Sequence, residues 1–293
     1  MNYHELLWKA KQILKAKGKE EADARYLLFF LMKWSSTDYL RHAAEEISAE
    51  TEQSYSELLN RRLAGVPVQQ IIGNQIFYGY EIEISKEVLT PRPETEQLVD
   101  LALSELKGKK RPKVMDLCTG SGCIAIAVAA ENRQARVVGV DVSKEALYLA
   151  KKNAERHGLE DIQWIESNLF EMLDSEKNGL EKFDMIISNP PYIPSEEIEN
   201  LEIEVRHYDP VLALDGGVDG LDFYRKISEK GQQYLVENGK LLLEIGHGQS
   251  KSICRILQTD GWKDCKEFKD YAGRERIIMA TKASQRDILG SSF

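Results

Sequence analysis

Long hydrophobic runs are missing from the first part of this 293-residue sequence. The longest apolar run near the amino terminus, Tyr26 to Met32, is far too short to span a bilayer. Residues Met1 to Lys17 mix acidic and basic side chains, unlike the basic start and apolar core of a signal peptide. We therefore predict a cytoplasmic protein with no membrane partner.

Cysteine is scarce, and its spacing lacks the patterns of metal and disulfide sites. The four cysteines, Cys118, Cys123, Cys254 and Cys265, contain no CxxC pair, and the five histidines are scattered. We therefore expect no metal site and no disulfide framework, which suits a reducing compartment.

An excess of basic charge is also missing. The chain has 39 Lys and Arg against 48 Asp and Glu, a formal net charge of -9. This balance argues against a protein that holds duplex nucleic acid mainly through its phosphates. We expect a monomer with no direct nucleic-acid partner, long enough for one large α/β domain and a smaller one.

The most informative segment that is present is Asn189-Pro190-Pro191-Tyr192, which follows the apolar run Phe183 to Ser188. Proline fixes its own φ and pushes the preceding residue toward an extended conformation, so Asn189 should be held rigidly at a strand end. The Asn189 side-chain oxygen and the Pro190 carbonyl then offer two acceptors to a planar NH2 group, with Tyr192 as a flat face beside it. Taken alone, the tetrapeptide is better explained as a turn around a buried tyrosine.

Residues 1–74 have the pattern of a small helical bundle. Apolar residues recur there at helical spacing, Ser48 suits an N-cap, and Gly65 with Pro67 suits a helix end. No cluster in this region has a catalytic pattern, so we expect it to pack or to hold a partner.

Residues 75–88 predict a β-hairpin linker, because apolar residues alternate around Gly79. The segment Thr90 to Glu96 comes next, in which Pro93 and its acidic neighbours suit a first helical turn. The start of a domain-joining helix explains this segment about equally well.

Residues 89–283 predict one domain in which strands alternate with helices. This alternation is typical of an α/β fold with a mostly parallel sheet and helices on both faces. No helix separates the last two strands, so we expect the last to be antiparallel, and residues 284–293 to form a flexible tail. The predicted strands are 114–118, 136–141, 162–166, 183–188, 240–245, 262–268 and 276–280, and the predicted helices are 123–130, 144–157, 221–236 and 249–258.

A glycine-rich turn, Asp116-Leu117-Cys118-Thr119-Gly120-Ser121-Gly122, ends the first of these strands and opens a helix. Glycine lets a backbone approach a ligand closely, and open sheets bind ligands at this edge. Asp141 ends the next strand, where a carboxylate can accept bonds from both hydroxyls of a ribose. Together these features favour a nucleoside cofactor.

Asp116 distinguishes between two such cofactors. The run Gly120 to Ala125 partly satisfies the dinucleotide fingerprint, but a carboxylate at Asp116 is unfavourable near a pyrophosphate. An ammonium or sulfonium group would be attracted, which favours S-adenosylmethionine over NAD.

After the third strand, Asn168 is predicted to bond an adenine edge, with Leu169 or Phe170 over the ring. A polar loop residue explains Asn168 about equally well.

Together these motifs resemble the class I S-adenosylmethionine-dependent methyltransferases. The Thr90 to Glu96 segment and the helical N-terminal domain make the chain similar to one branch, the peptide chain release factor N5-glutamine methyltransferases. The resemblance covers nearly the whole chain. It implies a Rossmann-like, seven-stranded, mostly parallel sheet and methylation of the glutamine in the Gly-Gly-Gln loop of release factors.

The resemblance also implies roles for particular residues. Asn189, Pro190 and Tyr192 would be catalytic, and Asn189, Pro190, Pro191 and Tyr192 would hold the glutamine. The family often has glycine at the position of Cys118 and aspartate at that of Asn168, and we interpret the Cys118 thiol as packing rather than chemistry. The implied cofactor contacts are Asp116, Cys118, Thr119, Gly120, Ser121, Gly122, Asp141, Asn168, Leu169 and Asn189.

Two other functions fit parts of the pattern. A nucleic-acid amino methyltransferase, acting on adenine N6 or on ribosomal RNA, also grips a planar NH2, but the acidic charge and the lack of a basic, aromatic segment argue against it. A noncatalytic nucleoside-binding protein is disfavoured by the tetrapeptide beside the cofactor turn. The acidic run after the tetrapeptide has two interpretations. It is a solvent-exposed helical or loop face, or its negative charge complements basic surface around the target loop of the substrate. Its members are Glu196, Glu197, Glu199, Glu202 and Glu204.

Overall fold

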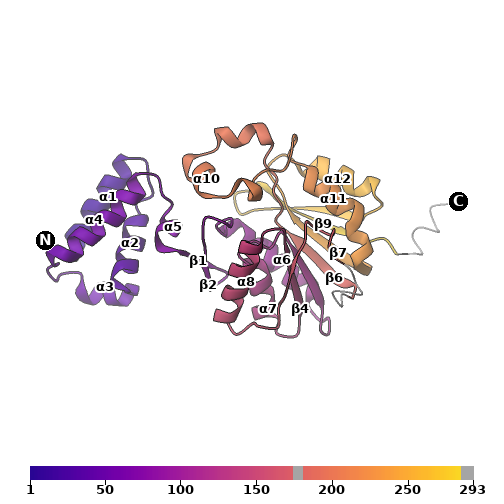
Figure 1. The fold of residues 1–293 in the computed structure, drawn as a ribbon, viewed down its shortest axis with the longest axis horizontal. Helices are drawn as coiled ribbons and strands as arrows, with labels where there is room; N and C mark the ends of the chain where they lie inside the picture. The colour runs from indigo at the N-terminus through magenta and orange to yellow at the C-terminus, as the bar shows by residue number, and fades with distance from the viewer. Residues whose placement is uncertain (174–180, 285–293) are drawn as a thin grey trace. The chain divides into compact units, whose positions relative to one another are not determined.

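The computed structural model describes residues 1–173 and 181–284 and separates into two compact units (Figure 1). Unit 1 comprises residues 1–74 together with residues 202–208, and unit 2 comprises the rest of the chain. The tail predicted at 284–293 lies outside the described residues from 285 onward. Among the described residues, no helix combines the length and the apolar character needed to cross a membrane.

Unit 1 is helical, as predicted. Ser48 caps α4 by accepting a hydrogen bond from the Thr51 N–H, which confirms the predicted N-cap. Leu14, Leu27 and Tyr55 are fully buried in its core. The helices are α1 (Tyr3–Ala16), α2 (Asp23–Met32), α3 (Ser36–His42), α4 (Ala49–Leu63), α5 (Val68–Ile72) and α10 (Ile203–Tyr208).

The segment that carries α10 joins unit 1 through a buried arginine. Arg62 donates from Nε to Asp23 over 2.6 Å and from Nη1 to Glu204 over 2.8 Å. Lys19 donates to the same Glu204 carboxylate. Both interpretations of the acidic run are therefore wrong for Glu204, because its charge is neutralised within unit 1.

Unit 2 contains a seven-stranded sheet of order β5-β4-β3-β6-β7-β9-β8. The first five of these strands are parallel, and β9 runs antiparallel to both β7 and β8. The predicted mostly parallel sheet and its antiparallel last strand are confirmed. The strands are β3 (Lys113–Leu117), β4 (Arg136–Asp141), β5 (Gln163–Glu166), β6 (Phe183–Ser188), β7 (Leu235–Glu244), β8 (Lys263–Lys269) and β9 (Glu275–Thr281).

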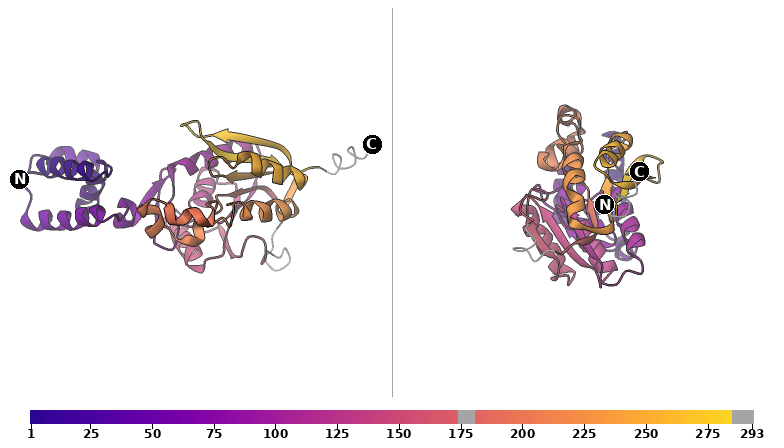
Figure 2. Two further views of the ribbon diagram at one scale, coloured as in Figure 1. Left: turned by 90° about the horizontal axis from the view of Figure 1, so that it is seen from above. Right: turned by 90° about the vertical axis from the view of Figure 1, so that its right-hand side faces the viewer.

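Helices cover both faces of this sheet and create two apolar cores (Figure 2). One core includes α6 (Glu96–Leu106), α7 (Cys123–Glu131) and α8 (Lys144–Arg156). The other includes α11 (Asp222–Gly231) and α12 (Ser250–Thr259). The short turns are η1 (Pro93–Thr95), η2 (Ser195–Asn200), η3 (Val211–Ala213) and η4 (Gln232–Tyr234).

The hairpin of β1 (Asn74–Phe77) and β2 (Tyr80–Glu83) is tied to the cofactor turn through Asn153 of α8. The buried Asn153 amide donates to the carbonyls of Glu83 and Ser121, both over 3.0 Å. This one side chain therefore fixes the hairpin and the turn to the same helix.

The helix predicted at 221–236 is wrong at its end. Helix α11 stops at Gly231, and β7 begins at Leu235 instead of Lys240. Leu235 pairs with Phe183 of β6 and Lys240 pairs with Met185, so residues 236–239 form a bulge. The apolar pattern of the helix continues into residues 232–236 and led to the longer prediction. The pairing of the fully buried Leu235 with β6 decides the structure there instead.

The expected absence of disulfides is also wrong. Cys254 of α12 and Cys265 of β8 form a disulfide, with Cα atoms 5.9 Å apart. The two residues are 11 positions apart, so they form no CxxC motif that the sequence could reveal. The packing of α12 on β8 brings them together. Cys118 and Cys123 are free.

Candidate active site

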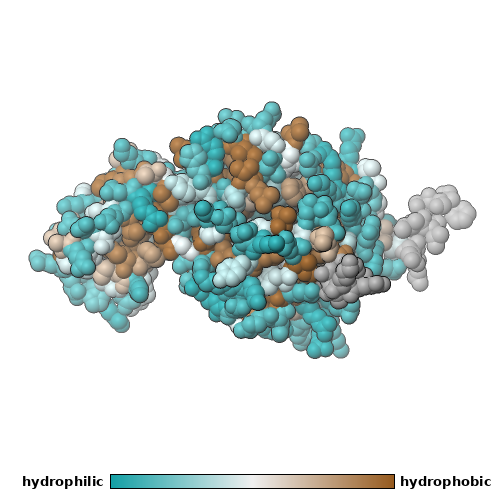
Figure 3. Space-filling view, in the orientation of Figure 1, coloured by the Kyte–Doolittle hydropathy of each residue, from teal (hydrophilic) through white to brown (hydrophobic). Residues whose placement is uncertain are grey.

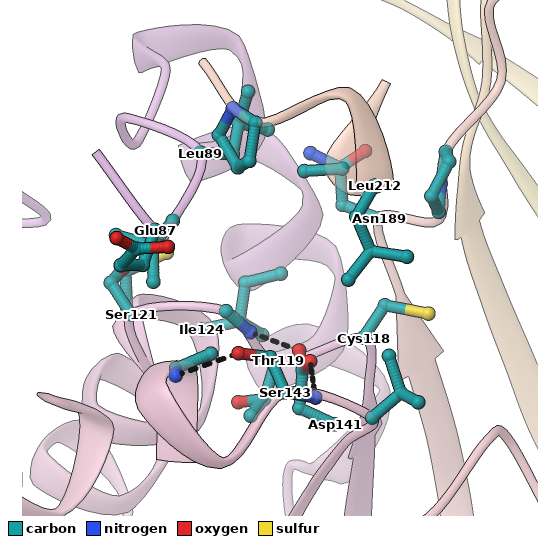
Figure 4. A pocket seen from close by; sticks show the side chains of 18 of the residues that line it. Glu87, Leu89, Cys118, Thr119, Ser121, Ile124, Asp141, Ser143, Asn189 and Leu212 are labelled. Carbon is teal, nitrogen blue, oxygen red and sulfur yellow. Dashed lines mark hydrogen bonds between the residues drawn. The ribbon is translucent and has the colours of Figure 1, made fainter. Parts of the chain in front are cut away.

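A cavity of about 250 Å³ opens at the carboxyl ends of β3, β4 and β6 (Figure 4). Asp141 and Ser143 lie on one side of it, and Asn189 and Leu212 lie on the other (Figure 4). Nine of the predicted site residues line the cavity: Cys118, Thr119, Gly120, Ser121, Asp141, Asn168, Leu169, Asn189 and Pro191. Asp116, Gly122, Pro190 and Tyr192 do not line it.

The turn after β3 bends back through left-handed backbone. Cys118 has φ +58°, so this residue lies outside the strand in which it was predicted. Gly122 has φ +80°, and a Cβ there would lie 2.9 Å from the Cβ of Ala150, so only glycine fits. The turn is therefore closely packed against α8 and presents its other side to the cavity.

Asp116 lies behind this turn and is completely buried. Its Oδ2 accepts hydrogen bonds from the Thr119 hydroxyl over 2.6 Å and from the Ala125 N–H over 3.1 Å. Its Oδ1 is buried and has no hydrogen-bond partner among the described residues. Burial raises the pKa of Asp116 to about 7, despite the opposing effect of these bonds. Asp116 thus holds the turn in place and retains one unused acceptor.

Asp141 ends β4, as predicted, and both of its oxygens face backbone donors. Oδ2 accepts from the Gly120 N–H over 2.8 Å, and Oδ1 accepts from the Ser143 N–H over 3.0 Å. Burial raises its pKa, and the backbone contacts from Ser143, Gly120 and Val142 oppose that effect. Each carboxylate oxygen has a second lone pair, so the group retains two acceptor positions.

Asn168 and Leu169 form another wall of the cavity. The Asn168 side chain donates to Glu171 over 2.9 Å, and Leu169 is buried with φ +51°. The Asn168 amide therefore has a partner on its own loop. The predicted contact with adenine would have to use its second N–H or its oxygen.

The tetrapeptide is held from outside by a glycine-rich loop. Tyr192 is partly buried against the second core, and its carbonyl accepts a hydrogen bond from Gln249 over 2.9 Å. A Cβ at Gly216 would lie 2.8 Å from the Tyr192 Cα, and one at Gly220 would lie 2.3 Å from its carbonyl oxygen. The backbone at Tyr192 is therefore clamped on two sides, as a rigid site requires.

Sequence reasoning missed three polar residues, of which Thr95 and Glu244 lie close to Asn189. Thr95 is buried and accepts a hydrogen bond from Asn189 Nδ2 over 3.4 Å. Glu244 is buried at the end of β7, and Asp209 pairs with Arg92 of the cavity wall over 2.6 Å. A carboxylate at the end of a buried strand is the signal that identified Asp141, and it would have identified Glu244 as well.

Exposed apolar side chains border the cavity beside Asn189. Val211 and Leu212 are 54% and 59% exposed, and Leu212 lines the opening. Hydrophobic residues interrupt the hydrophilic surface on the face seen in Figure 3.

Comparisons with known proteins place this architecture in a class. Residues 95–205 match the family described as methyltransferase small domain. A methyltransferase of Pyrococcus furiosus has the same fold, with a TM-score of 0.51 and 17% identity over 78% of this chain and 100% of that one. The sheet order, the glycine turn and these matches define a class I methyltransferase.

The relatives identify the branch within this class. Residues 5–73 match the family described as PrmC N-terminal domain. A release factor glutamine methyltransferase of Agrobacterium fabrum is 38% identical over 92% of this chain and 93% of its own length. One from Bacillus cereus is 37% identical over 95% and 98%. The chain belongs to the release factor glutamine methyltransferase family.

Proposed function

We propose that this protein transfers a methyl group from S-adenosylmethionine to the side-chain amide nitrogen, N5, of the glutamine in the Gly-Gly-Gln loop of peptide chain release factors. The observation that carries the proposal is Asn189 at the wall of a cavity that also contains the glycine turn and Asp141. Relatives that share nearly the whole chain have the matching name.

The cavity fits the methyl donor in its charge and hydrogen-bonding groups. Asp141 has acceptor positions left for two ribose hydroxyls, and the walls formed by Leu169 and Ile124 are apolar, as an adenine ring requires. The unused Oδ1 of Asp116 is a buried acceptor behind the turn, where a cation would be attracted. When bound, S-adenosylmethionine supplies an electrophilic methyl group on a positively charged sulfur.

The tetrapeptide supplies the groups that orient the amide. An amide nitrogen is a poor nucleophile because its lone pair is delocalised into the carbonyl. Asn189 Oδ1 and the Pro190 carbonyl accept the two N–H bonds, align the nitrogen and stabilise the positive charge that develops on it. Asp141 and the glycine turn would hold S-adenosylmethionine, which would supply its methyl group to this nitrogen, and the amide would release one N–H proton to solvent. The same two acceptors repel a glutamate carboxylate, which gives selectivity for the amide.

Incubation with labelled S-adenosylmethionine tests this function. We expect label on an intact release factor, and none on its loop variant with alanine in place of the glutamine or on ribosomal RNA and DNA. Labelling of nucleic acid, or of the alanine variant at an equal rate, would contradict the proposal.

The affinity for S-adenosylmethionine is expected to rise with pH, up to about tenfold between pH 6 and pH 8. The pKa of Asp116 is raised to about 7 in the free protein, so this carboxyl is largely protonated at pH 6. A cationic ligand favours the charged form, so tight binding requires loss of that proton, and the effect levels off above the free-state pKa. Calorimetry in two buffers of different ionisation enthalpy measures the proton release.

Asp116→Asn is the comparison for this titration. It cannot ionise, so its weaker binding should be nearly independent of pH over the same range. An equal pH slope in the wild type and the variant would assign the proton to another group.

A further inference from the structure

The proposed reaction requires the side-chain amide of Asn189 to have one of its two orientations. This amide has an acceptor oxygen and a donor NH2 group, and rotation by 180° exchanges them. The proposed function needs the oxygen toward the substrate, so something must hold the NH2 group on the other side. Proline residues restrain the backbone of the tetrapeptide, but they leave this side-chain rotation free.

The sheet places Glu244 beside Asn189. Strands β6 and β7 are parallel neighbours in which Ser188 pairs with Leu243. The next residues along, Asn189 just after β6 and Glu244 at the end of β7, therefore lie beside each other. Asn189 Nδ2 donates a hydrogen bond to Thr95 Oγ1 over 3.4 Å, and both side chains lie close enough to the Glu244 carboxyl to lower its pKa as hydrogen-bond donors.

The chemistry of these groups fixes the direction of the bonds. In its ionised form the Glu244 carboxylate only accepts hydrogen bonds, so in that form Asn189 must turn its NH2 toward Glu244. Thr95 Oγ1 accepts from Asn189 Nδ2, and its own hydrogen is left to face the nearby Glu244 carboxyl, which reinforces the same orientation. Burial raises the pKa of Glu244 to about 7, an effect that the charge of Arg276 opposes and the charge of Glu94 increases, so the ionised form prevails above neutral pH.

The burial of the Glu244 carboxyl lowers the stability of the fold, and packing does not explain why it is there. It is 2% exposed, and its Oε2 has no hydrogen-bond partner among the described residues. A buried carboxyl with an unsatisfied oxygen lowers stability, and such violations are expected at functional sites.

We propose that Glu244 and Thr95 are positioning residues, which hold the NH2 group of Asn189 away from the substrate and so present its Oδ1 to the substrate amide. This inference rests on the proposed methylation of a glutamine. It assigns selectivity for glutamine over glutamate to a pair that acts through the orientation of Asn189.

Glu244→Gln tests the inference, because a neutral amide can accept or donate and no longer fixes Asn189. We expect kcat for release factor methylation to fall about 10- to 100-fold, as when the partner that orients a ligand side chain is removed. The dissociation constant for S-adenosylmethionine should stay within about twofold, which a general loss of structure would not allow.

The second readout is discrimination between loop variants. Wild-type protein should bind the release factor with its loop glutamine much more tightly than the variant with glutamate there. In Glu244→Gln this preference should fall at least tenfold, because a rotated Asn189 can donate a hydrogen bond from its NH2 group to the glutamate carboxylate. Glu267→Gln, a matched change on β8, should behave as wild type.

Thr95 provides a second pair of variants if Glu244→Gln does not fold. Thr95→Ser keeps the hydroxyl and should retain activity, whereas Thr95→Val should lose both rate and discrimination. Unchanged kcat and preference in Glu244→Gln and Thr95→Val would overturn the inference. Failure of the wild type to methylate any release factor would instead overturn the proposed function.

Discussion

Asn189→Ala is expected to reduce the rate of release factor methylation by about 10² to 10³ at saturating S-adenosylmethionine. Loss of one preorganised hydrogen bond to a developing charge typically costs roughly 3 to 4 kcal/mol of transition-state stabilisation. Alanine removes the Oδ1 acceptor and leaves the Pro190 carbonyl, so the amide is held by one bond instead of two. Single-turnover kinetics with labelled cofactor measure the chemical step directly.

Two comparisons separate this effect from a disturbed fold. Asn200→Ala changes an exposed asparagine of the same unit and should keep the wild-type rate. Cofactor affinity of Asn189→Ala should fall far less than its rate, because the turn and Asp141 remain intact. A rate within a few-fold of wild type would show that the two-acceptor mechanism is wrong.

The sheet domain could be predicted closely from the sequence because its buried strands are short apolar runs with polar ends. Strands β4 and β6 have the predicted boundaries, and the glycine turn lies where the sequence predicts it. The bulge after Leu235 could not be predicted, because strand pairing decides it and the local pattern does not. The bond between Cys254 and Cys265 likewise depends on how α12 packs against β8.

Most of the predicted site residues line one cavity, and their roles in binding and catalysis stay predictions. Sequence spacing brings Cys118 through Ser121, Asp141 and Asn189 to one cavity, since all follow strands whose carboxyl ends meet at one edge. Thr95 was missed because it is distant in sequence from the tetrapeptide, whereas the position of Glu244 at the end of a buried strand could have identified it, as it did Asp141. Only the register of β6 with β7 places Glu244 beside Asn189.

Arg62→Ala is expected to lower the free energy of unfolding of unit 1 by about 3 to 5 kcal/mol. Removal of one partner from a buried ion pair leaves an uncompensated charge, and that penalty exceeds the value of the pair itself. The side chains of Arg62 and Asp23 are only 5% and 7% exposed. Burial raises the pKa of Asp23, and its bonds to Arg62 are what oppose that effect. Hydrogen exchange of the amides of α2 and α4 in the full chain measures the loss locally.

The neighbouring Arg61 provides the matched control for this prediction. Arg61 is exposed on the same helix, so Arg61→Ala should change stability by no more than about 0.5 kcal/mol. Asp23→Ala combined with Arg62→Ala should recover part of the loss, because the stranded carboxylate is then gone. Glu204→Gln should cost less than Arg62→Ala, since Glu204 is more exposed and the bond from Arg62 to Asp23 remains. If Arg62→Ala and Arg61→Ala have equal effects, then the buried arginine does not hold residues 202–208 to the helical unit.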